Sequence, residues 1–242
     1  MTYNNYEPQV DNGLYWSDDR SVEPIGVYTA KTFGWMALGL LATFAVAFAT
    51  WASGLWLTVL VQMPMIPFLL AIAEIAVVFF LSARIKNMSI GTARGMFFLY
   101  AVLNGLTFSS FFVLYDVASL IIAFGMTALY FGVLAAYGYV TKRDLSNLAP
   151  ILTSGLIFLV IFWVLSIFLP LSGFEKLVCF IGVAIFMGYT AYDTQKIKQF
   201  HQMYGGNPEL AGKASILCAL QLYLDFINLF LYILRLLGRR SD

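Results

Sequence analysis

Seven stretches of the sequence are apolar and long enough to cross a lipid bilayer as helices. A helix needs about 20 apolar residues to span about 30 Å of hydrocarbon. The chain has 242 residues, of which 61% are hydrophobic and 11% are charged. The predicted spans are residues 33–51, 66–83, 95–115, 117–139, 150–169, 177–193 and 214–237. We therefore expect an all-α membrane protein with seven transmembrane helices, whose connections are too short to form a soluble catalytic domain.

The chain divides into a tail and one membrane domain. Residues 1–29 are acidic and mix Asn, Tyr and Pro without a hydrophobic period, which predicts a disordered tail. The tail lacks the basic start of a cleavable signal peptide, so we expect it to be retained. Residues 30–242 form the predicted seven-helix transmembrane domain. Within it, Pro64 and Pro67 separate the run LWLTVLVQM from the second span, so this run is expected to be a short turn or interfacial segment.

The charge and the cysteines argue against a nucleic-acid-binding protein, a disulfide-bonded protein and a protein that binds a metal through its cysteines. The net charge is +1 and the basic residues form no dense run, so nucleic acid is not an expected partner. Cys179 and Cys218 both fall inside predicted spans, where they are expected to pack as small apolar side chains. Their spacing suggests neither a disulfide framework nor a metal site. We expect no cofactor.

The distribution of Lys and Arg predicts the orientation in the membrane. Short cytoplasmic loops carry an excess of basic residues. With the N-terminus inside, ten basic residues lie on the inner side and only Lys176 lies in an outer loop, apart from the C-terminal tail. The ten are Arg20, Lys31, Arg84, Lys86, Arg94, Lys142, Arg143, Lys196, Lys198 and Lys213. We predict a multi-pass protein of the plasma or inner membrane with a cytoplasmic N-terminus. Six crossings, which would return the basic C-terminal tail to the inside, are the alternative.

The last span carries a stripe of polar side chains. Gln221, Asp225, Asn228, Tyr232 and Arg235 follow one another at intervals of 4, 3, 4 and 3 residues, so they share one face of a helix built otherwise of Leu, Ile and Phe. Such a face is costly in lipid, so we expect it to point into the bundle and the C-terminal helix to be central. The stripe could serve only as a hydrogen-bonded seam between helices. The ionisable Asp225 favours a functional role.

Three acidic residues, Glu74, Asp193 and Asp225, lie within predicted spans. At 1.5 Å per residue, Asp193 and Asp225 fall at similar depths in the inner half, with Arg84 near Asp193 and Glu74 higher in the same interior. Two neighbouring carboxylates in a low dielectric share a proton and titrate as a coupled pair. Such a pair senses pH and, when deprotonated, binds Ca²⁺ weakly. Arg84 is predicted to pair with Asp193, either as a latch that protons or cations displace or as a static bridge.

Four motifs resemble those of one family of membrane proteins. They are IAEIAVVFFLSARI, GTARGMFFLYAVLNGLT, MGYTAYDTQKIKQF and LYLDFINLFLYILRLLG, and they look like the signatures of the Bax inhibitor 1 family, also called the transmembrane Bax inhibitor motif family. The resemblance implies two layers of three helices around a central C-terminal helix. It also implies a pH-sensitive calcium leak and protection against stress or cell death. By resemblance, Asp193 and Asp225 match a di-aspartyl pH sensor, and Arg84 and Glu74 match an arginine and a glutamate of the second helix.

Three functions compete. The residues favour a pH-sensitive calcium leak channel, gated by the aspartate pair with an arginine latch. The alternatives are a membrane-embedded regulator of other membrane proteins in a stress response and a proton-coupled cation exchanger. We expect no enzyme, because an intramembrane aspartyl protease needs a Gly-x-Gly-Asp context and Asp225 lies in LYLD. The expected partners are the lipid bilayer, calcium and protons, with other membrane proteins added if the chain is a regulator.

Overall fold

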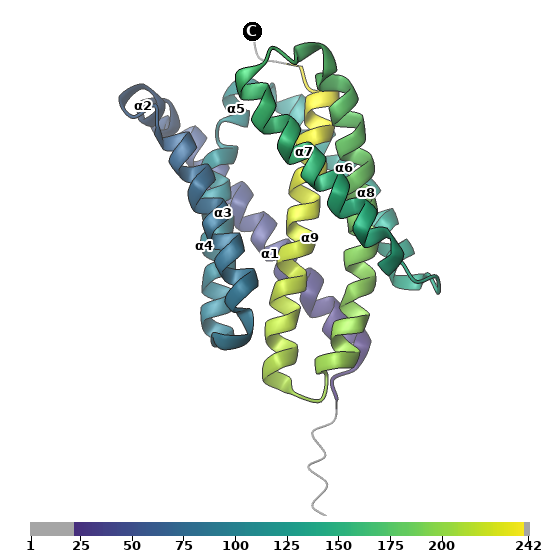
Figure 1. The fold of residues 1–242 in the computed structure, drawn as a ribbon. Coiled ribbons are helices and arrows are strands. Elements are labelled where there is room, and N and C mark those ends of the chain that lie inside the picture. The colour runs from purple at the N-terminus through teal and green to yellow at the C-terminus, as the bar shows by residue number, and fades with distance from the viewer. Residues whose placement is uncertain (1–21, 240–242) are drawn as a thin grey trace, which may run out of the picture.

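A computed structural model describes residues 22–239 of the chain. Over these residues every regular element is a helix, and seven helices are long and apolar enough to cross a membrane (Figure 1). They are α1 (Ile25–Ala52), α3 (Ile66–Arg84), α4 (Ile90–Phe108), α6 (Val117–Val140), α7 (Ala149–Phe168), α8 (Glu175–Tyr204) and α9 (Pro208–Leu237). The predicted all-α fold with seven transmembrane helices is confirmed.

Short helices and turns connect the spans. The run before Pro64 is separate from the second span, as predicted, but it forms a short helix, α2 (Leu55–Gln62), and not a turn. α5 (Phe111–Leu114) lies in the tight connection between α4 and α6. The other short elements are the 3₁₀ turns η1 (Ile85–Asn87), η2 (Ser146–Leu148) and η3 (Ser172–Phe174).

Capping side chains fix the starts of three helices. Ser89, Asp116 and Asn207 directly precede α4, α6 and α9, and their side-chain oxygens accept hydrogen bonds of 3.0 to 3.1 Å from backbone N–H groups of the first turn. These residue types are the preferred N-caps. Pro208 follows Asn207 at the first helical position, where its missing N–H costs nothing.

The first helix begins earlier than predicted. α1 starts at Ile25, within the predicted tail and before the predicted span at 33–51. Polar residues such as Lys31 and Thr32 lower the hydropathy of this region, but they do not break a helix. The rest of the predicted disordered tail, residues 1–21, lies outside the described residues. α8 and α9 also extend past their predicted spans, at the ends that carry Lys196, Lys198 and Lys213.

α9 is the central helix. It packs against α1, α4, α6 and α8, and Figure 1 shows it in yellow, with α3 and α4 to one side and α7 and α8 to the other. In the 18-residue apolar stretch of α9, 67% of the residues are buried inside the protein. The corresponding share is 6% for α3 and 11% for α7. The predicted central position of the C-terminal helix is confirmed, and α3 and α7 are outer helices.

Glycines allow close contact between pairs of helices. A Cβ atom at Gly105 of α4 would lie 2.8 Å from the Thr43 carbonyl oxygen of α1, and a Cβ atom at Gly138 of α6 would overlap the Ala191 carbonyl group of α8. Small residues at such points let helix backbones approach one another in a membrane. These two contacts hold α1 against α4 and α6 against α8.

The start of α1 and the end of α9 lie at opposite ends of the bundle (Figure 1), which fits seven crossings. We call the end that holds the α8–α9 connection the basic end, because it carries Lys31, Arg94, Lys142, Lys196 and Lys213. Which side of the membrane this end faces stays a prediction.

Candidate functional site

Asp193 on α8 and Asp225 on α9 are the two buried acidic side chains among residues 22–239. They are 6% and 4% exposed. α8 and α9 pack against each other. The structure therefore places the two predicted sensor residues, both buried, on adjoining helices.

Two buried threonines of α8 lie close to Asp193 in the sequence, but their hydroxyls bond within the helix and not to the aspartates. Thr190 and Thr194 are fully buried beside Asp193. Their hydroxyls donate to the backbone carbonyls four residues earlier, those of Phe186 and Thr190, at 2.8 and 2.7 Å. These hydroxyls are thus satisfied within their own helix.

One oxygen of the pair has no partner in the described part of the chain. Oδ2 of Asp225 is buried and accepts no hydrogen bond there, and the same holds for Oε1 of Gln221, one turn earlier on α9. A buried polar atom without a partner costs about 1–3 kcal/mol, and more if it is charged. A proton shared with Asp193, a water molecule or a cation would satisfy Asp225, so the site is suited to a small exchangeable ligand.

Lys196 is the cation beside the pair. Its Nζ lies 3.8 Å from Oδ1 of Asp193, and its side chain is 20% exposed. The two residues are three apart on α8, a spacing that places them on neighbouring positions of one helix face. The charge distribution along the sequence identifies Lys196 only as one of the inner basic residues. The spacing within DTQK was the signal that could have identified it.

The predicted contact between Arg84 and Asp193 is wrong. Arg84 is the last residue of α3, and its side chain is exposed. α3 packs on α4 and η1, and α9 lies between α3 and α8 in Figure 1. Among the described residues, Lys196 is the cation within ion-pair distance of Asp193. The prediction compared depths in the membrane, and equal depth does not bring two helices together.

Glu74 lies in a different polar cluster. Its side chain is partly buried, and the Thr107 hydroxyl donates a hydrogen bond of 2.6 Å to its Oε1. Two turns before Thr107 on α4, the Tyr100 ring packs on the Tyr223 ring of α9, with 5.6 Å between ring centres. Tyr223 and Asp225 are two residues apart, which turns their side chains about 200° around the helix. The Glu74 cluster thus lies toward the face of α9 that carries Tyr223, and the predicted depth of Glu74 above the aspartates stays a prediction.

Further hydrogen bonds join α1, α4 and α9 in this Glu74 cluster. The Asn104 amide donates to the Tyr100 hydroxyl at 3.1 Å. The hydroxyls of Thr43 and Tyr223 lie 2.6 Å apart. Oδ1 of Asn104 is buried without a partner among the described residues. The cluster therefore involves four helices, α1, α3, α4 and α9, and it retains one unsatisfied acceptor among residues 22–239.

The predicted stripe on α9 becomes more exposed toward the C-terminus. Asn228 donates to the Leu224 carbonyl of its own helix at 2.8 Å. The Tyr232 ring stacks on Phe186 of α8, with 5.9 Å between ring centres. Arg235 is exposed and lines a cavity of about 690 Å³ with Glu175 and Lys176. Asp225 and Tyr232 thus face α8, while Arg235 lies at the opposite end from the basic end.

Comparison with known proteins settles the family. Residues 26–242 match the family described as Inhibitor of apoptosis-promoting Bax1. The chain belongs to this Bax inhibitor family. The resemblance of its four motifs is thereby confirmed.

Relatives of this Bax inhibitor family protein occur in several bacteria. Inner membrane protein YbhL of Escherichia coli (strain K12) is 42% identical over 226 residues, which are 92% of this chain and 97% of YbhL. An uncharacterized protein of Deinococcus radiodurans is 36% identical over 226 residues, 93% of this chain and 96% of its own. An uncharacterized protein of Borreliella burgdorferi is 36% identical over 215 residues, 89% and 93% of the two chains. This Bax inhibitor family member is an integral, multi-pass membrane protein.

The weak calcium site predicted at Asp193 and Asp225 of this Bax inhibitor family protein stays a prediction. Among residues 22–239, no group of three or more His, Cys, Asp or Glu side chains comes together as a metal site. Ca²⁺ takes 6–8 oxygen ligands. Asp193 and Asp225 would have to share such an ion with carbonyl groups and water.

Proposed function

We propose that this protein conducts a pH-sensitive leak of calcium across the membrane and that Asp193 and Asp225 regulate it. The observation that supports the proposal is the buried Oδ2 of Asp225, which lacks a hydrogen-bond partner among the described residues and lies beside a second buried carboxyl group. Ionisable residues at membrane depth usually mark ion pathways or proton relays.

The chemistry of the pair provides a mechanism. When the two carboxyls share one proton, they carry one negative charge, which Lys196 balances at 3.8 Å. When the proton leaves, two negative charges face one ammonium group, and a divalent cation can neutralise the excess. Protons and Ca²⁺ therefore compete for the same oxygens. In this proposal Lys196 takes the latch role that the sequence analysis assigned to Arg84.

The proposal includes no enzymatic step. Asp193 follows Tyr192 and Asp225 follows Leu224, so large side chains flank both carboxyls where a protease would need glycine for peptide access. We also propose that the basic end faces the cytoplasm of a cell whose inner membrane holds the protein. The distribution of Lys and Arg supports this orientation, and the name of YbhL supports the location.

Calcium flux into liposomes tests the proposal. The purified protein, reconstituted alone, is expected to move Ca²⁺ to a calcium dye sealed inside, at a rate that depends on pH. Asp193→Asn and Asp225→Asn should each flatten the pH profile, and the double variant should add little because the two residues act as one unit. Asp144→Asn is the matched control, since Asp144 is an exposed acid in the α6–α7 connection.

The alternatives give different results in the same assay. A protein that moves no Ca²⁺ in intact liposomes at any pH would be a regulator of other membrane proteins. Flux that requires an opposing proton gradient would indicate an exchanger. Additive losses in the double variant would show that the aspartates do not act as a pair.

A further inference from the structure

A second cavity opens at the basic end of the bundle. Its volume is about 620 Å³, and Asp193 and Asp225 are not among its lining residues. Four helices form its walls. They contribute Lys31, Trp35 and Leu38 from α1, Arg94 from α4, His201 from α8 and Gly212 from α9. The mechanism proposed above uses none of these side chains.

The cavity carries a net positive charge. Lys31 and Arg94 bring two positive charges from different helices, and Glu23, which forms an ion pair with Lys31, brings one negative charge. The Arg94 guanidinium lies 4.8 Å from the centre of the Trp35 ring. Its side chain is exposed, and within residues 22–239 no carboxylate lies within ion-pair distance of it. The ring of Trp35 thus positions Arg94, whose five N–H donors have no hydrogen-bond partner among residues 22–239 and can bind a ligand.

Polar groups form the floor of the cavity. His201 Nε2 lies 2.6 Å from the Glu23 carbonyl oxygen, which ties the chain entering α1 to the end of α8. The Tyr28 ring lies 5.2 Å from the His201 ring. Tyr28 is 1% exposed, and its hydroxyl has no hydrogen-bond partner among the described residues. The floor therefore contains a buried hydroxyl that can still donate a hydrogen bond.

The wall formed by α1 runs from the charged side chains toward the part of the helix that is exposed to lipid. Gly34 and the adjacent Trp35 line the cavity, and so does Leu38, about one turn later on α1. Leu38 is 49% exposed, and Leu41, in the next turn, is 65% exposed. Trp is typical of the membrane interface, where its ring lies at the depth of the lipid head groups. A ligand that fits both parts has an anionic head and an apolar chain.

We propose that this cavity binds the phosphate head group of an anionic phospholipid. Arg94 contacts the phosphate, because a guanidinium matches phosphate geometry with two parallel hydrogen bonds. Lys31 adds a second, weaker contact, since the phosphate competes with Glu23 for it. An acyl chain lies along Trp35 and Leu38. Basic pockets between transmembrane helices are known to bind such head groups.

Lipid binding to the purified full-length protein tests this proposal. Native mass spectrometry compares added phosphatidylglycerol with phosphatidylcholine of the same acyl chains. The wild type should retain phosphatidylglycerol preferentially, and Arg94→Gln should weaken its binding about tenfold, the effect of losing a charge-assisted contact. Lys31→Gln should have a smaller effect. Both residues are exposed, so both variants should fold, and circular dichroism checks this.

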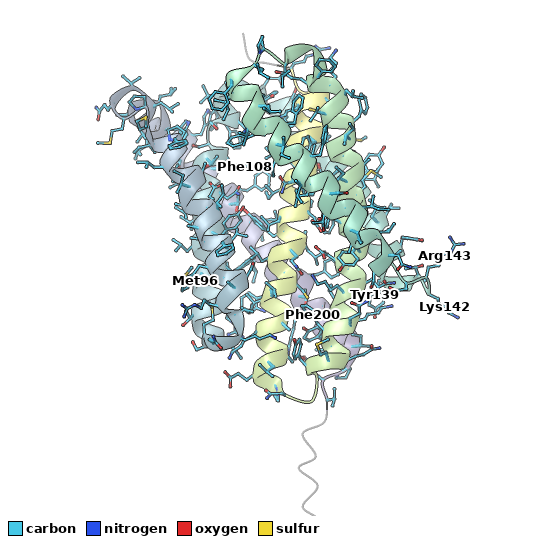
Figure 2. All side chains as sticks on the ribbon, viewed as in Figure 1. Met96, Phe108, Tyr139, Lys142, Arg143 and Phe200 are labelled. Atoms are coloured by element: carbon cyan, nitrogen blue, oxygen red, sulfur yellow. The ribbon has the colours of Figure 1, made fainter. Side chains whose placement is uncertain are left out.

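Lys142→Gln is the matched control. Lys142 is an exposed basic residue near the basic end, and Figure 2 shows it pointing away from the bundle, beside Arg143. The Lys142→Gln variant should bind phosphatidylglycerol as well as the wild type does. Equal retention of the two lipids, or equal losses in Arg94→Gln and Lys142→Gln, would overturn the proposal. Displacement of the lipid by inorganic phosphate at similar concentrations would also overturn it, because the site would then be one for free anions.

Discussion

Gln195 holds the connection between α6 and α7, because its Oε1 accepts a hydrogen bond of 2.8 Å from the backbone N–H of Leu145. Its Nε2 donates to the Arg143 carbonyl at 2.7 Å. Gln195 is two residues from Asp193 on α8. The connection therefore anchors the part of α8 that carries the buried aspartate.

Gln195→Ala should lower the stability of the protein by about 1–2 kcal/mol, because each of the two hydrogen bonds contributes about 1 kcal/mol. Thermal unfolding in detergent measures this. Gln199→Ala is the control, since its amide reaches Ser146 only at a long 3.4 Å. Equal losses in the two variants would show that the Gln195 bonds do not anchor the connection.

The function proposed here predicts different roles for Lys196 and Arg84. Lys196→Gln removes the cation 3.8 Å from Asp193, so the pair should keep its proton to higher pH and the midpoint of calcium flux should move up by about one pH unit. Arg84→Gln should leave the midpoint unchanged, because Arg84 is exposed at the end of α3. Liposome flux against pH measures both. If the pH midpoint of calcium flux moved in Arg84→Gln but not in Lys196→Gln, Arg84 would be the latch residue.

The Glu74 cluster predicts a rescue between α3 and α4. Thr107→Val removes the donor of the 2.6 Å bond to Glu74, and a carboxyl group left unpaired in the membrane should cost about 1–3 kcal/mol. Adding Glu74→Leu should restore part of the loss, because replacing both partners with apolar groups is nearly neutral. Thermal unfolding of the single and double variants measures this. A double variant less stable than Thr107→Val would contradict it.

The contact between α6 and α8 predicts a contrast between two glycines of one helix. Gly138→Ala places a methyl group against the Ala191 carbonyl, and a backbone neighbour cannot move aside as a side chain can. It should cost about 1–3 kcal/mol. Gly125→Ala, also on α6, has no atom within 4 Å of the new methyl group, so it should be neutral or slightly stabilising. Unfolding in detergent compares them, and equal stability would contradict the close contact.

Periodicity and hydropathy predicted those properties that lie along a single helix. They predicted the seven spans, the central α9 and the shared depth of Asp193 and Asp225, because each depends on residue spacing alone. They did not predict which helix lies beside which. Arg84 and Asp193 were placed together by depth, but lateral position depends on pairwise packing, such as α3 on α4 through Glu74 and Thr107. A single sequence contains no direct record of such pairs.

The same limit explains the position of Glu74. Its position in the sequence predicts its depth in the membrane. It does not predict that the Glu74 cluster lies toward the face of α9 that carries Tyr223. Lys196 was overlooked for a different reason. A basic residue near the end of a span is explained by the orientation rule alone, so its three-residue spacing from Asp193 does not stand out in the sequence.

α9 follows the other six spanning helices in the chain, yet it fills the centre that they surround. A ribosome therefore delivers six helices to the membrane before the helix that they pack around. Until α9 arrives, Thr43 lacks the Tyr223 hydroxyl and Asp193 lacks its neighbouring carboxyl group. Assembly is consequently a late event, and a chain cut short before α9 would leave these polar faces in lipid, where quality-control proteases recognise unassembled proteins.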